Sequence, residues 1–217
     1  MSSRKQALIF ANGQIDNLEA VARFSSTDNL IIAADGGARH CQKLGMTPNV
    51  LIGDFDSLDE AELQIYEQAG AQIIRHPARK DYTDLELALL HAKSLGVTQA
   101  VIFGGLGLRW DQTLANLLLP ASSELSQMKI QLVDGNQEIT VLHAGDEYEF
   151  HGNPGDTVSL IPLNADTTGI SAWGLEYPLA NESLAFGSTR GVSNVLVGTT
   201  ASLHLERGVL LCVVIHH

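Results

Sequence analysis

The chain has 217 residues, of which 45% are hydrophobic and 18% charged, and its formal net charge at pH 7 is −12. This composition is typical of a globular protein with a substantial core, and the length allows one large or two small domains. The acidic balance argues against nonspecific binding to nucleic acid or to an anionic membrane, because neither gains from a negative surface.

The sequence carries no signal for export, membrane insertion or disulfide formation. Its first residues lack the apolar core of a signal peptide, and no apolar run approaches membrane-spanning length. Only Cys41 and Cys212 are present, far apart and both in apolar surroundings, so we expect two buried free thiols. A cytoplasmic location is therefore expected, and the final His216 and His217 are given no role.

Strand and helix patterns alternate in the first part of the chain. Short apolar runs predict strands at residues 7–10, 30–34, 50–52, 72–75, 100–103 and 130–133. Two capping boxes, Ser57–Glu60 and Thr83–Glu86, predict helix starts. After the second box, one helix face carries Leu85, Ala88, Leu89, Ala92 and Leu95, and Gly96 supplies the stop. This alternation predicts a mostly parallel sheet with helices on both faces, with ligands at the carboxyl ends of its strands.

The pattern changes at about Gln137, where helical periodicity ends and turn-forming residues become frequent. The runs 158–161, 194–197, 201–205 and 209–215 predict strands, and Gly145, Gly155 and Gly208 mark corners between them. We therefore predict an α/β domain over residues 1–135 and an antiparallel β-sandwich domain over residues 136–217.

Four acidic turns follow the predicted strands of the first domain. They are Asp35-Gly36-Gly37, Gly53–Ser57, Lys80–Asp84 and Gly104–Asp111. Carboxylates gathered at strand ends repel one another unless a cation lies among them. Asp54 and Asp56 are two residues apart, so in extended backbone they point to the same side, and their hard oxygen atoms suit Mg²⁺. The alternative is that each of them only caps a turn or a helix.

The third turn combines acidic and basic residues. Asp84 lies in the first turn of a predicted helix, where the helix dipole alone would favour a carboxylate. Lys80 stands beside Asp81 and Asp84, with Arg75 and Arg79 nearby. This mixture suits a polyphosphate held jointly by cations and a metal ion.

The fourth turn is rich in glycine. Gly104, Gly105 and Gly107 precede a predicted helix at residues 110–119, where glycines let backbone amides approach a phosphate. The spacing matches neither a P-loop nor a dinucleotide-binding fingerprint. Arg109 and Asp111 strengthen the interpretation, because an arginine can clamp phosphate oxygens in two places. The glycines of the first turn are explained equally well by a tight turn between a strand and a helix.

Taken in order, the four turns resemble the signature of the thiamin pyrophosphokinase family, and residues 174–179 and 191–194 resemble its C-terminal segments. The resemblance spans nearly the whole chain. It implies magnesium-dependent transfer of the pyrophosphoryl group of ATP to the hydroxyl of thiamin, giving thiamin diphosphate and AMP. It also implies a homodimer, with each active site between the α/β domain of one subunit and the β domain of the other.

Matching positions to the family's motifs implies a role for each singled-out residue. The metal ligands would be Asp54, Asp56 and Asp84. The catalytic residues would be Arg109 with Asp81 or Asp111, either of which could orient or deprotonate the alcohol. ATP would be bound by Asp35, Gly36, Lys80, Gly104, Gly105, Gly107, Arg109 and Gln112, and thiamin by Tyr177, Ser193 and Asn194. Two departures stand out, since many bacterial members carry His at the position of Gln112, and Tyr177 replaces a larger Trp.

Three alternatives remain beside this prediction. The same chemistry could serve another hydroxymethyl heterocycle, such as a pterin. Asp54-x-Asp56 superficially resembles the nucleophile motif of aspartyl-phosphate phosphatases, but it follows the third predicted strand, and Leu58 stands where Thr or Val is expected. The last alternative is a nonenzymatic module that senses thiamin or a nucleotide.

Overall fold

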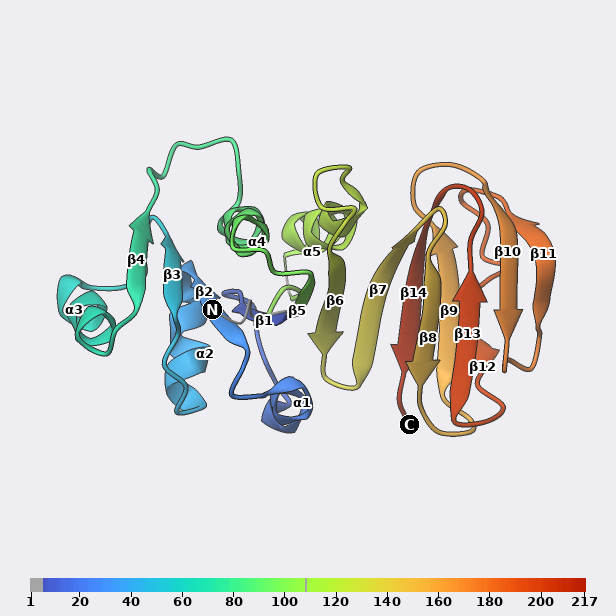
Figure 1. The fold of residues 1–217 in the computed structure, drawn as a ribbon, viewed down its shortest axis with the longest axis horizontal. Coiled ribbons are helices and arrows are strands. Elements are labelled where there is room, and N and C mark those ends of the chain that lie inside the picture. The colour runs from blue at the N-terminus through green and yellow to red at the C-terminus, as the bar shows by residue number, and fades with distance from the viewer. Residues whose placement is uncertain (1–5, 108) are drawn as a thin grey trace. The chain divides into compact units, whose positions relative to one another are not determined.

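The computed structural model describes residues 6–107 and 109–217, so Leu108 of the glycine turn lies outside the described residues. The chain forms two compact units (Figure 1). The first comprises the described part of Met1–Pro120 together with Gln127–Gly135, and the second comprises Ala121–Ser126 and Asn136–His217.

The first unit contains a parallel sheet with the strand order β6-β5-β1-β2-β3-β4. Its strands are β1 (Gln6–Phe10), β2 (Leu30–Ala34), β3 (Val50–Gly53), β4 (Gln72–Arg75), β5 (Gln99–Phe103) and β6 (Lys129–Asp134). Every strand predicted from the sequence of this unit is present. The order places β1 between β2 and β5, so the turns after these three strands meet at one edge of the sheet.

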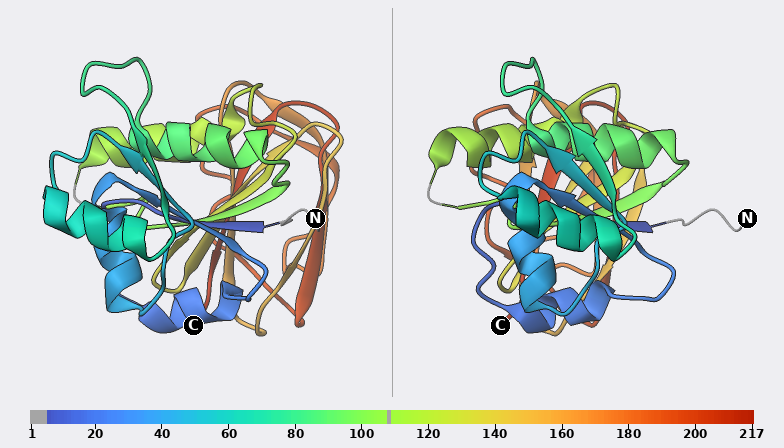
Figure 2. Two further views of the ribbon diagram at one scale, coloured as in Figure 1. Left: turned by 60° about the vertical axis from the view of Figure 1, so that its left-hand side comes forward. Right: turned by 90° about the vertical axis from the view of Figure 1, so that its left-hand side faces the viewer.

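Helices cover both faces of this sheet, as predicted. They are α1 (Leu18–Phe24), α2 (Ala38–Lys43), α3 (Glu60–Gln68), α4 (Asp84–Ser94) and α5 (Trp110–Leu118), with 3-10 turns η1 (Asp35–Gly37) and η2 (Leu119–Ala121). Figure 2 shows α4 and α5 on one face and α1 and α2 on the other. None of the described helices is long and apolar enough to cross a membrane.

The helix α4 begins where the sequence predicts. Thr83 is its N-cap and accepts a hydrogen bond from the Glu86 amide at 3.2 Å. The predicted apolar face is buried at Leu85, Ala88, Leu89 and Ala92. Leu95 is 49% exposed, contrary to expectation, because the helix ends one residue earlier and Leu95 forms its C-cap.

The predicted capping box at Ser57 and Glu60 is wrong. The helix α3 is capped instead by Asp59, which accepts from the Glu62 amide at 2.7 Å, while the Glu62 carboxylate accepts from the Asp59 amide at 2.9 Å. Two overlapping patterns of the same type occur here, and the second one forms the cap. Ser57 is thereby free to donate its hydroxyl hydrogen to the Asp35 carboxylate, whose oxygens lie 3.2 Å away.

The second unit is an antiparallel β-sandwich, which confirms the predicted fold class. Within this unit, β12-β9-β14-β7 are successive neighbours in one sheet, and β11-β10-β13-β8 form a separate four-stranded sheet. The strands are β7 (Gln137–His143), β8 (Glu147–His151), β9 (Thr157–Pro162), β10 (Thr167–Trp173), β11 (Leu179–Leu184), β12 (Asn194–Val195), β13 (Thr200–His204) and β14 (Val209–Ile215). Side chains from both sheets, including Leu160, Ile170, Leu203 and Leu210, form one core cluster. The predicted corners at Gly145, Gly155 and Gly208 all have positive φ.

Both cysteines are buried and free, as expected. Burial raises the pKa of the Cys41 thiol and of the Cys212 thiol to about 12, so both remain protonated and unreactive at neutral pH.

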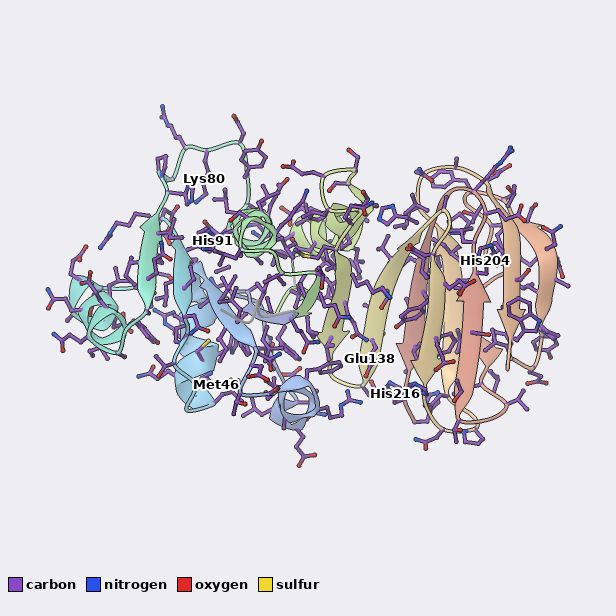
Figure 3. All side chains as sticks on the ribbon, viewed as in Figure 1. Met46, Lys80, His91, Glu138, His204 and His216 are labelled. Carbon is purple, nitrogen blue, oxygen red and sulfur yellow. The ribbon has the colours of Figure 1, made fainter. Side chains whose placement is uncertain are left out.

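The buried Asp156 ties the chain beyond the last strand of the sandwich to neighbouring strands. The Asp156 side chain is 1% exposed and accepts hydrogen bonds from the Asn153 amide at 2.8 Å and the His217 amide at 3.0 Å. The His216 ring lies between Asp156, at 2.8 Å, and Glu138, at 3.3 Å (Figure 3). Burial pushes the pKa of Asp156 upward, but these hydrogen bonds outweigh it, and the net effect is a lowered pKa.

Candidate active site

A cavity of about 740 Å³ lies at the carboxyl ends of β1, β2 and β5 in the first unit. Its wall combines the turns after these strands with the first turns of α4 and α5. Predicted site residues that line it are Asp35, Asp84, Gly104, Gly105, Gly107, Arg109, Asp111 and Gln112. The sheet topology therefore gathers most of the residues that were predicted to bind ATP.

Three carboxylates form an acidic trio at this edge of the sheet. Asp35, Asp54 and Asp56 can each offer one oxygen such that the three oxygens lie within 4.8 Å of one another. The intervening Phe55 is 5% exposed and anchors the turn, with Asp54 and Asp56 flanking it. Asp35 and Phe55 both adopt a left-handed backbone conformation, with φ of 45° and 57°. Such strained residues concentrate at functional sites, and this donor set suits a hard divalent cation.

Asp84 has a different partner in this structure. The Lys80 ammonium lies 2.6 Å from its carboxylate, and the two side chains are only 12% and 27% exposed. Lys80 extends from the loop between β4 and α4, which also carries the exposed Asp81 (Figure 3). Asp84 thus lines the cavity outside the acidic trio, with its charge matched by a lysine.

The turn after β5 is bound tightly to the turn after β1. The Ala11 amide donates to the Phe103 carbonyl at 2.9 Å, and the Gly13 amide donates to the Gly104 carbonyl at 2.8 Å. A Cβ at Gly13 would lie 2.4 Å from the Gly104 oxygen, and one at Gly104 would lie 2.7 Å from the Ala11 oxygen. Only glycine allows this close approach, and Gly104 also has a φ of 66°.

Side chains from α5 hold the remainder of the glycine turn. The Thr113 hydroxyl is 3.1 Å from both the amide and the carbonyl of Gly107, and the Asn116 amide donates to the Gly105 carbonyl at 2.6 Å. These bonds tie the backbone of Gly105 and of Gly107 to α5.

Arg109 and Asp111 form an exposed ion pair at the mouth of the cavity. The Arg109 Nε donates to Asp111 Oδ1 at 3.1 Å, and its Nη2 contacts the other carboxylate oxygen. The hydrogen bond from Arg109 and then that from the Gln112 amide hold the pKa of Asp111 below its usual range. Asp111 is consequently ionised at neutral pH and a weak base, which suits an orienting role better than proton abstraction.

The residues predicted to bind thiamin lie together in the second unit. The Tyr177 amide donates to Asn194 Oδ1 at 3.1 Å, and Asn194 Nδ2 donates to the Tyr177 carbonyl at 2.8 Å. The Tyr177 side chain is 65% exposed, so its ring is available to a partner. Ser193, next in the chain, has a φ of 63° and donates its amide hydrogen to the Ser159 hydroxyl at 3.0 Å.

Residues 21–132 match the family described as thiamin pyrophosphokinase, catalytic domain, and residues 142–210 match thiamin pyrophosphokinase, vitamin B1 binding domain. The chain belongs to the thiamin pyrophosphokinase family. It is 30% identical to the thiamine pyrophosphokinase of Bacillus subtilis over 206 residues, covering 94% of this chain and 96% of that one. The predicted family is thus confirmed.

Solved structures of thiamin pyrophosphokinases agree with the fold. The Bacillus subtilis crystal structure superposes with a TM-score of 0.86 at 28% identity, covering 98% of this chain and 100% of that one. The Geobacillus thermodenitrificans enzyme gives a TM-score of 0.82 at 25% identity, covering 97% of each chain. These relatives support the thiamin pyrophosphokinase prediction and give no support to the pterin alternative.

The turn after β1 also lines the cavity, although the sequence analysis did not predict it as part of the site. Asn12 and Gly13 line the cavity, and so do Thr83 and Asn116. The Asn12-Gly13 pair, one residue beyond a predicted strand, was a usable signal. Asn-Gly marks a turn, and turns that follow parallel strands lie at the ligand-binding edge of the sheet. The contact of Asn116 with the glycine turn could not be predicted from the sequence, because it depends on how α5 packs against that turn.

Proposed function

We propose that the protein transfers the pyrophosphoryl group of ATP to the hydroxyl of thiamin, forming thiamin diphosphate and AMP. The observation that carries this proposal is that one cavity is lined both by the glycine turn and by the carboxylates of Asp35, Asp84 and Asp111. Family membership supplies the substrates, and the cavity supplies the two chemical environments that a metal–polyphosphate complex needs.

The glycine turn and Arg109 are proposed to hold the phosphates of ATP. Backbone amides at Gly104 and Gly105 offer donors without adding bulk, while the Gly107 amide is bonded to Thr113 and holds the turn in place. The helix α5 begins just beyond them, so its positive end adds to the field. Arg109 is exposed and can turn its guanidinium from Asp111 to a phosphate, since an exposed ion pair contributes little.

The acidic trio is proposed to hold Mg²⁺, which when bound neutralises phosphate charge. Asp54 and Asp56 were predicted ligands, and Asp35 joins them because its carboxylate lies in the same group. Asp84 remains a predicted ligand whose carboxylate must first leave Lys80. The released Lys80 ammonium would then be available to the polyphosphate.

The thiamin hydroxyl is proposed to be oriented by Asp111 or Asp81. Asp111 lines the cavity and carries a full negative charge, whereas Asp81 is exposed on the loop before α4. Attack on a phosphoryl group depends on in-line positioning and charge neutralisation more than on a strong base. An ionised carboxylate that orients the hydroxyl meets that requirement without acting as a strong base.

The thiamin ring is proposed to stack on Tyr177 of a second copy of the chain, near Ser193 and Asn194. A cationic thiazolium favours an aromatic face and an acidic surface. The helix α5 supports dimerisation, because Trp110, Leu114 and Leu118 are 81%, 58% and 41% exposed and recur at every fourth residue. A second copy of the chain that packs on this apolar stripe would remove it from water.

The activity is tested by incubating the purified protein with ATP, Mg²⁺ and thiamin. We expect AMP and thiamin diphosphate in equal amounts, and no product from a hydroxymethylpterin. Release of inorganic phosphate would indicate the phosphatase chemistry instead. ATP binding without any turnover would support the sensing module.

The dimer is tested by light scattering. Leu114→Glu should convert the dimer to a monomer and reduce turnover at least tenfold, because it buries a charge in the interface. Ile65→Glu, on α3 at 66% exposure, is the matched control and should leave the dimer intact. A wild-type monomer with full activity would rule out the shared site.

A further inference from the structure

Asn12 packs against Gly36 at the wall of the cavity. Its exposed side chain follows β1 and lines the cavity. The amide lies flat against Gly36, since a Cβ there would come within 2.1 Å of Asn12 Oδ1 and 2.9 Å of Nδ2. The buried Gly36 thus provides the space that the amide occupies.

The backbone on both sides of Asn12 is equally constrained. The preceding Ala11 amide and the following Gly13 amide are bonded to the end of β5 and the glycine turn. The Gly13 carbonyl is also 2.7 Å from the Nε2 of His40 on α2. Contacts from β5, the glycine turn and α2 therefore fix the position of this residue.

The side-chain amide of Asn12 forms no hydrogen bond with the described residues, whereas nearby polar side chains do. Across residues 6–107 and 109–217, no hydrogen bond involves the Asn12 side chain. By contrast, Asn116 is bonded to Gly105 and Thr113 to Gly107 in the same cavity. A side chain with two donors and one acceptor that stands on a restrained backbone and faces a cavity is arranged to meet a ligand.

The neighbours of Asn12 indicate which group of the ligand it meets. Gly36 follows Asp35 of the acidic trio, and Gly13 adjoins Gly104 of the glycine turn. Asn12 thus lies between the two features that are proposed to hold the metal and the phosphates. A neutral amide can donate to a phosphate oxygen there without competing for the metal.

We infer that Asn12 is a positioning residue that donates an Nδ2 hydrogen bond to a nonbridging phosphate oxygen of the nucleotide. The inference rests on the proposed function, because it requires a nucleotide in this cavity. Its effect would be to fix the polyphosphate between the glycine turn and the acidic trio, and so to align it for in-line attack.

The test compares two substitutions of nearly the same size. Asn12→Leu removes the hydrogen bond without adding charge, and Asn12→Asp replaces the donors by acceptors. Calorimetry with a nonhydrolysable ATP analogue and Mg²⁺ should show binding about tenfold to hundredfold weaker for Leu and weaker still for Asp, as for loss of one hydrogen bond to a charged group. Asn12→Ser, which keeps a donor, should recover part of the affinity.

Three measurements distinguish a direct role of Asn12 in nucleotide binding from a role in stabilising the fold. The thermal midpoint and the KM for thiamin should stay unchanged in Asn12→Leu, while the KM for ATP rises. The matched control is Gln68→Leu, an exposed amide on α3 away from the cavity, which should behave as wild type.

The outcomes also distinguish this inference from the proposed function. Wild type that forms thiamin diphosphate, with both variants binding the analogue as wild type does, would overturn the role of Asn12. A raised KM for thiamin with unchanged nucleotide binding would overturn it as well. Wild type that binds the analogue in an Asn12-dependent way but forms no thiamin diphosphate would support the inference and refute the proposed acceptor.

Discussion

Replacing Asp35 by Asn should stabilise the metal-free protein and weaken its response to Mg²⁺. The substitution removes one charge from the acidic trio and changes little else. Asn tolerates the φ of 45° found at this position about as well as Asp does. The Ser57 hydroxyl, 3.2 Å from the Asp35 oxygens, can still donate to the amide oxygen of Asn. Charge is therefore the main variable that the substitution tests.

The expected size follows from the spacing of the carboxylates. Two like charges separated by the 4.8 Å limit of the trio repel by about 1 kcal/mol in water and about 3.5 kcal/mol at an effective dielectric constant of 20. Asp56 is exposed and Asp35 and Asp54 are only partly buried, so the lower value is the better guide. Removing Asp35 relieves two such pairs, so the free energy of unfolding of the metal-free protein should rise by about 1–2 kcal/mol.

Mg²⁺ should offset the stability gain of the variant. A bound ion stabilises the folded state by an amount that grows with the logarithm of the ratio of its concentration to its Kd. Loss of one carboxylate ligand should weaken that affinity by roughly tenfold or more. Urea unfolding in EDTA and in millimolar Mg²⁺ measures both effects. Asp28→Asn, which removes an exposed charge from the turn before β2, is the matched control and should shift neither value by more than about 0.5 kcal/mol.

A purely structural role for Asp35 predicts the opposite result. The metal-free variant would then be less stable than wild type, because the contact with Ser57 would be weakened. Its stabilisation by Mg²⁺ would remain complete. That pair of observations would refute the assignment of Asp35 to a metal site.

Three further predictions concern other parts of the chain. Lys80→Gln should raise Mg²⁺ affinity about threefold to tenfold and lower ATP affinity, both by calorimetry, because the partner carboxylate is freed and a cation is lost. Gly13→Ala should cost about 1–3 kcal/mol in urea unfolding and most of the activity, because its Cβ would lie 2.4 Å from a carbonyl oxygen, whereas Gly198→Ala has open space and should be tolerated. Asp156→Asn should lower the free energy of unfolding at pH 7 by about 1–3 kcal/mol. Since the folded pKa of Asp156 lies below the ordinary 3.8, its contribution is complete above that value and is lost as pH falls through the folded pKa, so only wild type should lose this contribution in acid.

The sequence predicted the fold of both units and the turns that build the cavity, but not which carboxylates meet. Asp35 and Asp54 are far apart in the chain, and their proximity depends on the register of β2 against β3. That register pairs Ala34 with Ile52, which brings the residues just beyond each strand to the same level. No periodicity in a single sequence reveals the register of a parallel pair, because the strands are joined through a helix. Asp35 was accordingly assigned to ATP and not to the metal.

The charges in the cavity finally explain how so acidic a protein could hold a polyphosphate. Lys80 and Arg109, the two cations predicted to bind phosphate, are both paired with carboxylates of the chain itself. Among residues 6–107 and 109–217, none of the three carboxylates of the acidic trio forms an ion pair, so the charge of this region favours a metal ion over a free polyphosphate. We therefore expect binding of the ATP analogue to be abolished by EDTA and restored by Mg²⁺, while binding of cationic thiamin weakens far less. Equal analogue affinity with and without Mg²⁺ would show that the two cations suffice, and would contradict this account of the site.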